Sequence, residues 1–213
     1  MSVYDSAPAR APVYGPIHKV HRFALASAVA RVGAADYADK DEALEVAGLV
    51  RQQIAMGRAH LRNEDRHIHP LLRSGSIAHV AELDTAHDEH ERDFAALEAL
   101  AKRIEQGSSA ERIAAGRELY LEFARFVARD FEHMDFEERV VEPAIHASHS
   151  DAQIEAAHRA VVAETSADEL QALGELASQA LSPPELEKVA ELLKSGQSAD
   201  DPIAAQPEAA AAT

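Results

Sequence analysis

The chain has no cysteine and no tryptophan, and among its 213 residues only four tyrosines and six phenylalanines. The absence of cysteine excludes disulfide bonds, zinc–thiolate sites and iron–sulfur clusters, and it suits a reducing compartment. No apolar run reaches the roughly 18 residues of a membrane span, and residues 1–16 lack the apolar core of a secretory signal. We therefore expect a soluble cytoplasmic protein.

Basic residues are scarce: 21 Lys and Arg stand against 37 Asp and Glu, which gives a formal net charge of −16. This balance argues against nucleic acid or an anionic membrane surface as a partner. The sequence also lacks a glycine-rich phosphate loop and the G-x-S-x-G pattern of a serine nucleophile. These absences leave few of the common classes of catalytic site.

Residues that favour helices, chiefly Ala, Leu, Glu and Arg, dominate the composition, and apolar residues recur at helical spacing along most of the chain. The pattern predicts an all-α fold. Pro70 and Pro143 should end the second and fourth helices, because proline cannot continue the helical hydrogen-bond ladder. Four long helices with short loops predict an up-down four-helix bundle. Their expected ranges are roughly 16–32, 39–70, 80–106 and 108–143.

Shorter helices with N-cap signatures follow the predicted bundle, and they carry no metal-ligand pattern. They should either pack beside the bundle or mediate self-association into a homo-oligomer. The predicted organisation is a flexible N-terminal segment, a bundle, a helical extension and a disordered Ala/Pro-rich tail. These parts cover residues 1–15, 16–149, 150–194 and 195–213.

Histidine is abundant, with twelve in the chain, and two helices carry the pattern H-x-x-x-E. The pairs are His60 with Glu64 and His133 with Glu137. A spacing of four places the imidazole and the carboxylate on one helix face, where they form half of a metal site. One such pair is commonly an exposed polar pair. Two pairs together with His87, which lies on the core-facing stripe of the third helix, favour a metal site inside the bundle.

Each long helix offers at least one candidate ligand, and none offers a thiolate. Imidazole and carboxylate together suit iron or manganese, and also zinc. The glutamates of the two H-x-x-x-E helices could bridge a pair of metal ions. His67 shares the ligand face of the second helix, but a role beside the site or in solvent is favoured for it. The candidates, in helix order, are His18 or His21, then His60 and Glu64, then His87 with His90 or Glu91, then His133 and Glu137.

These motifs resemble those of the bacterial hemerythrin-like domains. The matching stretches are His18 on the first helix, His60 to Glu64 on the second, His87 to Glu91 on the third and His133 to Glu137 on the fourth. The resemblance covers about residues 16–165 and implies a hemerythrin-like bundle holding two non-haem iron ions. It implies His18, His60, His87 and His133 as ligands, with Glu64 and Glu137 as bridging carboxylates.

The third helix departs from the oxygen-carrying members of that family, which have a second histidine where this chain has Glu91. Glu91 is our predicted seventh ligand, with His90 as the alternative. A carboxylate at this position would favour the ferric state, and therefore redox chemistry over simple oxygen carriage. His69, at the predicted end of the second helix, is expected only to hydrogen-bond the last turn.

The function predicted from these features is binding of, or reaction with, dioxygen, nitric oxide or peroxide at a diiron centre. Storage, sensing and scavenging would all use the same centre. Two alternatives remain open: oxidation or handling of iron by a ferritin-like site, and a metal-free helical interaction module.

Overall fold

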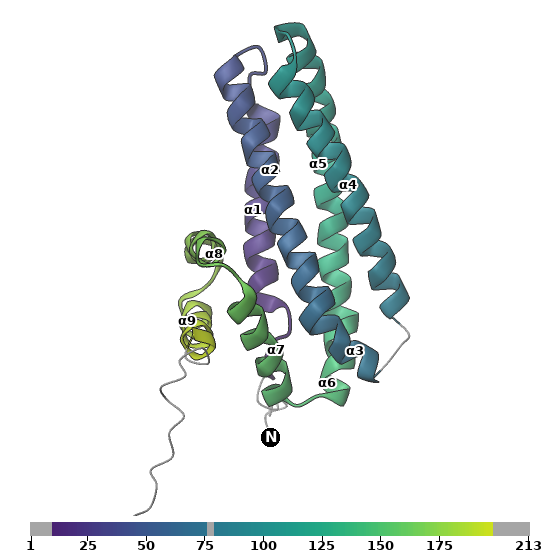
Figure 1. Cartoon of the computed structure of the whole chain (residues 1–213), viewed down its shortest axis with the longest axis vertical. Coiled ribbons are helices and arrows are strands. Elements are labelled where there is room, and N and C mark those ends of the chain that lie inside the picture. Colours follow the sequence, from purple (N-terminus) through teal and green to yellow (C-terminus); the bar gives the residue numbers. More distant parts are fainter. Residues whose placement is uncertain (1–9, 76–78, 198–213) are drawn as a thin grey trace, which may run out of the picture.

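The computed structural model describes residues 10–75 and 79–197, and within these ranges all regular secondary structure is helical. Each of the four long helices packs against the next along the chain, and the last packs against the first, which closes the ring (Figure 1). The predicted all-α bundle is therefore confirmed. The long helices are α1 (Gly15–Ala34), α2 (Lys40–Asn63), α4 (Val80–Gln106) and α5 (Ser109–Phe136).

The starts of these helices follow from local capping chemistry. The Asp39 carboxylate accepts hydrogen bonds from the backbone N–H groups of Asp41 and Glu42, which opens α2. Ser108 and Glu111 form a capping box at the start of α5. Each cap satisfies backbone N–H groups that have no partner within the helix. The predicted starts near residues 39 and 108 are thus confirmed.

The two H-x-x-x-E helices do not end at their prolines. After Asn63 the chain makes one π-helical turn, η1 (Glu64–Ile68), and continues as α3 (His69–Gly75). After Phe136 it makes a second, η2 (Glu137–Val141), and continues as α6 (Glu142–Ser148). The N–H of His69 donates to the Glu64 carbonyl, and that of Glu142 to the Glu137 carbonyl, five residues back in each case.

The prolines account for this departure from the predicted helix ends. Pro70 and Pro143 each follow directly after the residue that closes a π turn. Proline has no backbone N–H to donate to the carbonyl four residues back, so it interrupts the α-helical hydrogen bonds. The π turn before each proline interrupts them at the same place. The helices therefore continue past the prolines with their faces rotated.

Two apolar clusters fill the bundle on either side of a polar layer. Along α2 and its continuation, Ile54 belongs to the first cluster and Ile68 to the second. Along α5 and its continuation, Val127 belongs to the first and Val141 to the second. The H-x-x-x-E segments lie between these residues on both helices. Burial of the flanking apolar side chains therefore fixes the polar layer within the bundle.

The shorter C-terminal helices are α7 (Asp151–Glu164), α8 (Ala167–Ala180) and α9 (Pro183–Gln197). Ala177 and Leu181 pack against Val20 of α1, so α8 lies beside the bundle (Figure 1). Most of the predicted flexible start and disordered tail lies outside the described residues. None of the helices in the described ranges is both long and apolar enough to cross a membrane.

Candidate metal centre

Seven histidine and glutamate side chains form the polar layer, and each is at most 8 % exposed. They come from α1, α2, α4 and α5, from the first residue of each π turn (η1 and η2), and from the start of α3. Ionisable groups in a bundle core must be paired, hydrogen-bonded or bound to metal to offset the loss of hydration. The seven residues are His18, His60, Glu64, His69, His87, His133 and Glu137.

The first imidazole set, His18 and His60, meets one oxygen of each glutamate. Glu64 Oε1 lies 3.1 Å from His60 Nε2 and 3.4 Å from His18 Nε2. Glu137 Oε2 lies 3.4 Å from the same His18 nitrogen. One ligand atom from each of these four residues lies within 4.8 Å of the others, which is a spacing suited to a single metal ion.

The second imidazole set consists of His69, His87 and His133, and it meets the other oxygen of each glutamate. Glu64 Oε2 lies 3.6 Å from His87 Nε2. Glu137 Oε1 lies 3.5 Å from Nε2 of both His133 and His69. Each carboxylate therefore directs one oxygen to each set, which is the arrangement of two carboxylates that bridge a pair of metal ions.

Several buried atoms of this layer have no hydrogen-bond partner among the described residues: His60 Nε2, His69 Nε2, Glu64 Oε2 and both carboxylate oxygens of Glu137. Native proteins leave few buried polar atoms unpaired, because each costs about 1–3 kcal/mol. All five of these atoms point into one layer and all are good metal donors. The residues present thus fit a metal site.

Acidic groups outside the layer orient three of the imidazoles. Asp65 Oδ1 lies 3.0 Å from His87 Nδ1 and 3.2 Å from His69 Nδ1. Glu138 Oε1 lies 3.0 Å from His18 Nδ1. A proton held on Nδ1 by such a carboxylate leaves Nε2 free to bind metal.

The electrostatics keep part of the donor set neutral. Burial, followed by the neighbouring imidazoles His21 and His18, holds the pKa of His60 well below its usual value. Burial lowers the pKa of His133 to about 4, against the opposing effect of Glu137. Neutral imidazoles bind metal without first losing a proton.

His18 and His69 behave in the opposite way. Burial disfavours the charged form of each, but the hydrogen bonds that the His18 ring donates to Glu138 and Glu64 outweigh it and raise the pKa of His18 to about 9. Contacts with Asp65 and Glu137 likewise raise the pKa of His69 to about 9. Burial would raise the pKa of Glu137, but contacts with His69 and His133 outweigh it and lower that pKa. Burial and the charge of Glu137 raise the pKa of Glu64 to about 7.

Six of the seven predicted ligands come together in the layer, and Glu91 does not. The Glu91 side chain is 52 % exposed and its Oε2 lies 3.1 Å from Arg58 Nε on the surface. The alternative, His90, is buried with its Nε2 3.0 Å from Asp130 Oδ1. The His90 ring lies 5.0 Å from that of His133, so it adjoins the layer.

The two remaining candidate histidines, His21 and His67, do not enter the layer. His21 is buried, and its ring centroid lies 4.2 Å from that of His60. His67 faces α7, where its Nε2 lies 3.1 Å from Glu164 Oε2.

His69 was not among the predicted ligands. The prediction treated the second helix as ending near Pro70, whereas the π turn η1 carries His69 back to the face of Glu64. A signal was present in the sequence: both segments read H-x-x-x-E-x-x-x-x-[H/E]-P, with His69 in one and Glu142 in the other. A proline at the same place in both marks the paired π turns.

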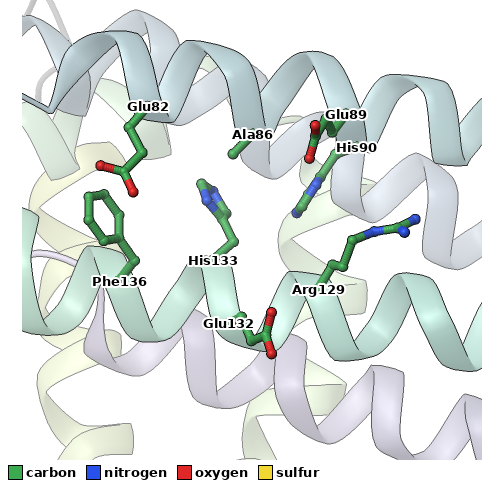
Figure 2. A pocket seen from close by; sticks show the side chains of 8 residues that line it. All are labelled: Glu82, Ala86, Glu89, His90, Arg129, Glu132, His133 and Phe136. Atoms are coloured by element: carbon green, nitrogen blue, oxygen red, sulfur yellow. The ribbon is translucent and has the colours of Figure 1, made fainter.

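A groove of about 240 Å³ between α4 and α5 reaches this layer (Figure 2). His133 from α5 and His90 from α4 both line it, and glutamates of both helices surround them. An imidazole of the second set is therefore adjacent to the surface groove. The lining residues are Glu82, Ala86, Glu89, His90, Arg129, Glu132, His133 and Phe136.

Comparison with protein families gives a match to the hemerythrin HHE cation binding domain over residues 17–145. This range contains the four long helices, except for the first two residues of α1, and all seven residues of the polar layer. The chain therefore belongs to the hemerythrin HHE cation-binding family. Comparison with curated proteins and with solved structures gives no match.

Proposed function

We propose that the chain holds two non-haem iron ions bridged by Glu64 and Glu137, and that this pair binds or reacts with a small ligand such as dioxygen, nitric oxide or peroxide. The division of the carboxylate oxygens carries the proposal: one oxygen of each glutamate faces each imidazole set. A bound iron pair would supply an open coordination position and electrons for the incoming ligand.

The two imidazole sets differ in the number of donors. The first set offers two imidazoles and two carboxylate oxygens, whereas the second offers three imidazoles, because His69 and His133 both lie near Glu137 Oε1. The metal ion with fewer protein donors has more room for an external ligand. We therefore assign ligand binding to the side of His18 and His60.

The identity of the seventh donor changes the redox expectation. Glu91 would have added an anionic oxygen, which favours the ferric state. His69 adds a nitrogen that is neutral once it binds metal, so the ferrous state is stabilised relative to that expectation. With His69 in place of Glu91, reversible ligand binding is a candidate activity together with sensing and scavenging.

Both alternative functions have less support. Ferritin-like sites are mainly carboxylate, whereas this layer contains five imidazoles and two carboxylates. If the protein were a metal-free interaction module, the unpaired donor atoms gathered in one buried layer would have no explanation.

The test is anaerobic reconstitution with ferrous iron, followed by iron analysis and optical spectra before and after exposure to dioxygen. We expect about two iron ions per chain, as carboxylate-bridged pairs require. A visible band that appears with dioxygen and disappears on its removal would indicate reversible binding, and steady ferrous consumption would indicate iron oxidation. A folded wild type without iron, equal to the His60→Ala/His133→Ala control, would refute the diiron proposal.

A further inference from the structure

Tyr14 lies against the first imidazole set and is unusual in its hydrogen bonding. Its side chain is 1 % exposed, and its ring stacks on that of His18 with centroids 5.0 Å apart and planes 20° from parallel. Its hydroxyl is buried and has no hydrogen-bond partner among the described residues. A buried tyrosine hydroxyl usually finds a partner, because an unpaired one loses its hydration without compensation.

The position of Tyr14 is fixed by the second H-x-x-x-E helix. Tyr14 is the N-cap of α1. The backbone N–H groups of Val13 and Tyr14 donate to Glu142 Oε2 at 3.0 and 3.3 Å. Glu142 is the residue that closes the π turn beginning at Glu137. The same turn that aims Glu137 into the layer therefore holds Tyr14 beside it.

A second anchor holds the segment before Tyr14. Arg10 donates from Nε to Asp151 Oδ1 at 2.8 Å and from Nη2 to the His149 carbonyl at 2.6 Å. These bonds join the segment to the residue that follows α6 and to the start of α7. Residues 10–14 are thus held at one end by Arg10 and at the other by the backbone of Val13 and Tyr14. These contacts keep Tyr14 beside His18.

The Tyr14 hydroxyl needs a different kind of partner from the unpaired atoms of the polar layer. His60 Nε2 and the Glu137 oxygens are metal donors, which a metal ion would satisfy. A phenol hydroxyl is a hydrogen-bond donor as well as an acceptor. By contrast Tyr37, the other buried tyrosine among the described residues, donates to the Val32 carbonyl at 3.0 Å.

We propose that the Tyr14 hydroxyl donates a hydrogen bond to an external anionic or diatomic ligand bound on the His18 side of the metal centre. The inference rests on the proposed diiron function and adds to it a specific protein group that holds the ligand. The hydroxyl would then select ligands that can accept a hydrogen bond. It would also disfavour apolar ligands of the same size, since they would leave it unpaired.

The test uses azide as the probe on the full chain loaded with iron and oxidised. The affinity for azide is measured by optical titration, and the azide antisymmetric stretch by infrared spectroscopy in H₂O and D₂O. We expect Tyr14→Phe to weaken azide binding roughly tenfold to a hundredfold, the loss of one hydrogen bond to a charged group. The wild-type stretch should shift in D₂O, and this isotope shift should vanish in Tyr14→Phe.

Tyr37→Phe is the matched control, because it removes a buried hydroxyl of the first apolar cluster and should leave azide binding unchanged. The isotope shift in the wild type needs no substitution, so it remains informative even if Tyr14→Phe folds poorly. Equal azide affinity and equal stretch in wild type and Tyr14→Phe would overturn the hydrogen bond while leaving the diiron proposal intact. A phenolate-to-iron charge-transfer band lost in Tyr14→Phe would overturn it in favour of direct ligation. A wild type that loads no iron would overturn both proposals.

Discussion

His69 Nε2 lies 3.5 Å from Oε1 of Glu137, and this contact joins the π turn of one H-x-x-x-E helix to the carboxylate of the other. The two residues belong to helices that are far apart in sequence, and His69 lies beyond the range that helical spacing from His60 would assign to the site. The contact makes the second imidazole set richer in nitrogen than the first.

Replacement of His69 by alanine should therefore weaken metal binding by about tenfold or more, because even groups that only orient a ligand contribute that much. Metal affinity can be measured by competition with a chelator of known affinity. Glu91→Gln is the matched control, since the Glu91 side chain pairs with Arg58 on the surface. Weaker binding in Glu91→Gln with unchanged binding in His69→Ala would restore Glu91 as the ligand.

Asp65 contacts Nδ1 of both His69 and His87, so one carboxylate orients two imidazoles of the second set. Asp65→Ala should lower metal affinity about tenfold to a hundredfold while leaving the ligands themselves in place. The same chelator competition measures the effect, and Asp88→Ala, at an exposed position of α4, is the control. Equal affinities in the two variants would contradict this role.

Metal loading should release protons. The pKa of His18 and of His69 is raised to about 9 in the metal-free protein, so both are protonated near neutral pH and must lose a proton to bind metal. With Co²⁺ as a divalent probe ion in place of iron, the apparent metal affinity should therefore rise with pH between about 6 and about 8. A pH indicator in weakly buffered solution measures the release. Loading without proton release, and with affinity independent of pH, would contradict the raised pKa values.

The raised pKa values of His18 and His69 also affect the stability of the metal-free fold. A histidine pKa raised from 6.5 to about 9 on folding stabilises the fold fully below pH 6.5. This contribution is lost as the pH rises through about 9. Metal-free His69→Ala should lose part of this pH dependence, which denaturant unfolding at several pH values can measure.

Two helical glycines should respond in opposite directions to alanine. A Cβ on Gly116 of α5 would lie 2.3 Å from the Tyr37 ring, whereas a Cβ on Gly48 of α2 meets no atom within 4 Å. Gly116→Ala should destabilise the fold by about 1–3 kcal/mol through overpacking. Gly48→Ala should stabilise it by about 0.5–1 kcal/mol, because alanine is the better helix former. Thermal or denaturant unfolding of both variants checks the pair.

Local features account for most of what could be predicted. The caps at Asp39 and Ser108 need only neighbouring residues, and the spacing within His60–Glu64 and His133–Glu137 is a property of any helix. The apolar stripe through His87 likewise predicts which face of α4 is buried. These patterns were enough for an all-α bundle and for six of the residues in its polar layer.

The third helix shows where such reasoning stops. His90 and Glu91 are adjacent, and both lie within one turn of His87, so either could be assigned to the site by spacing. The packing of α4 against its neighbours turns His90 inward to Asp130 and leaves Glu91 with Arg58. The apolar stripe of α4 does indicate that His90 faces inward, but Asp130 and Arg58 lie on other helices, so the sequence of α4 alone does not contain these pairings.

The sequence by itself therefore determined the bundle, the helix starts and the H-x-x-x-E half-sites, because caps and periodicity act over a few residues. Only the tertiary structure decided that the glutamates direct one oxygen to each imidazole set, that His69 joins them and that Tyr14 stands beside them. These relationships depend on two π turns and on contacts between helices distant in the chain. Their physical origin is the packing that aligns those turns within one buried layer.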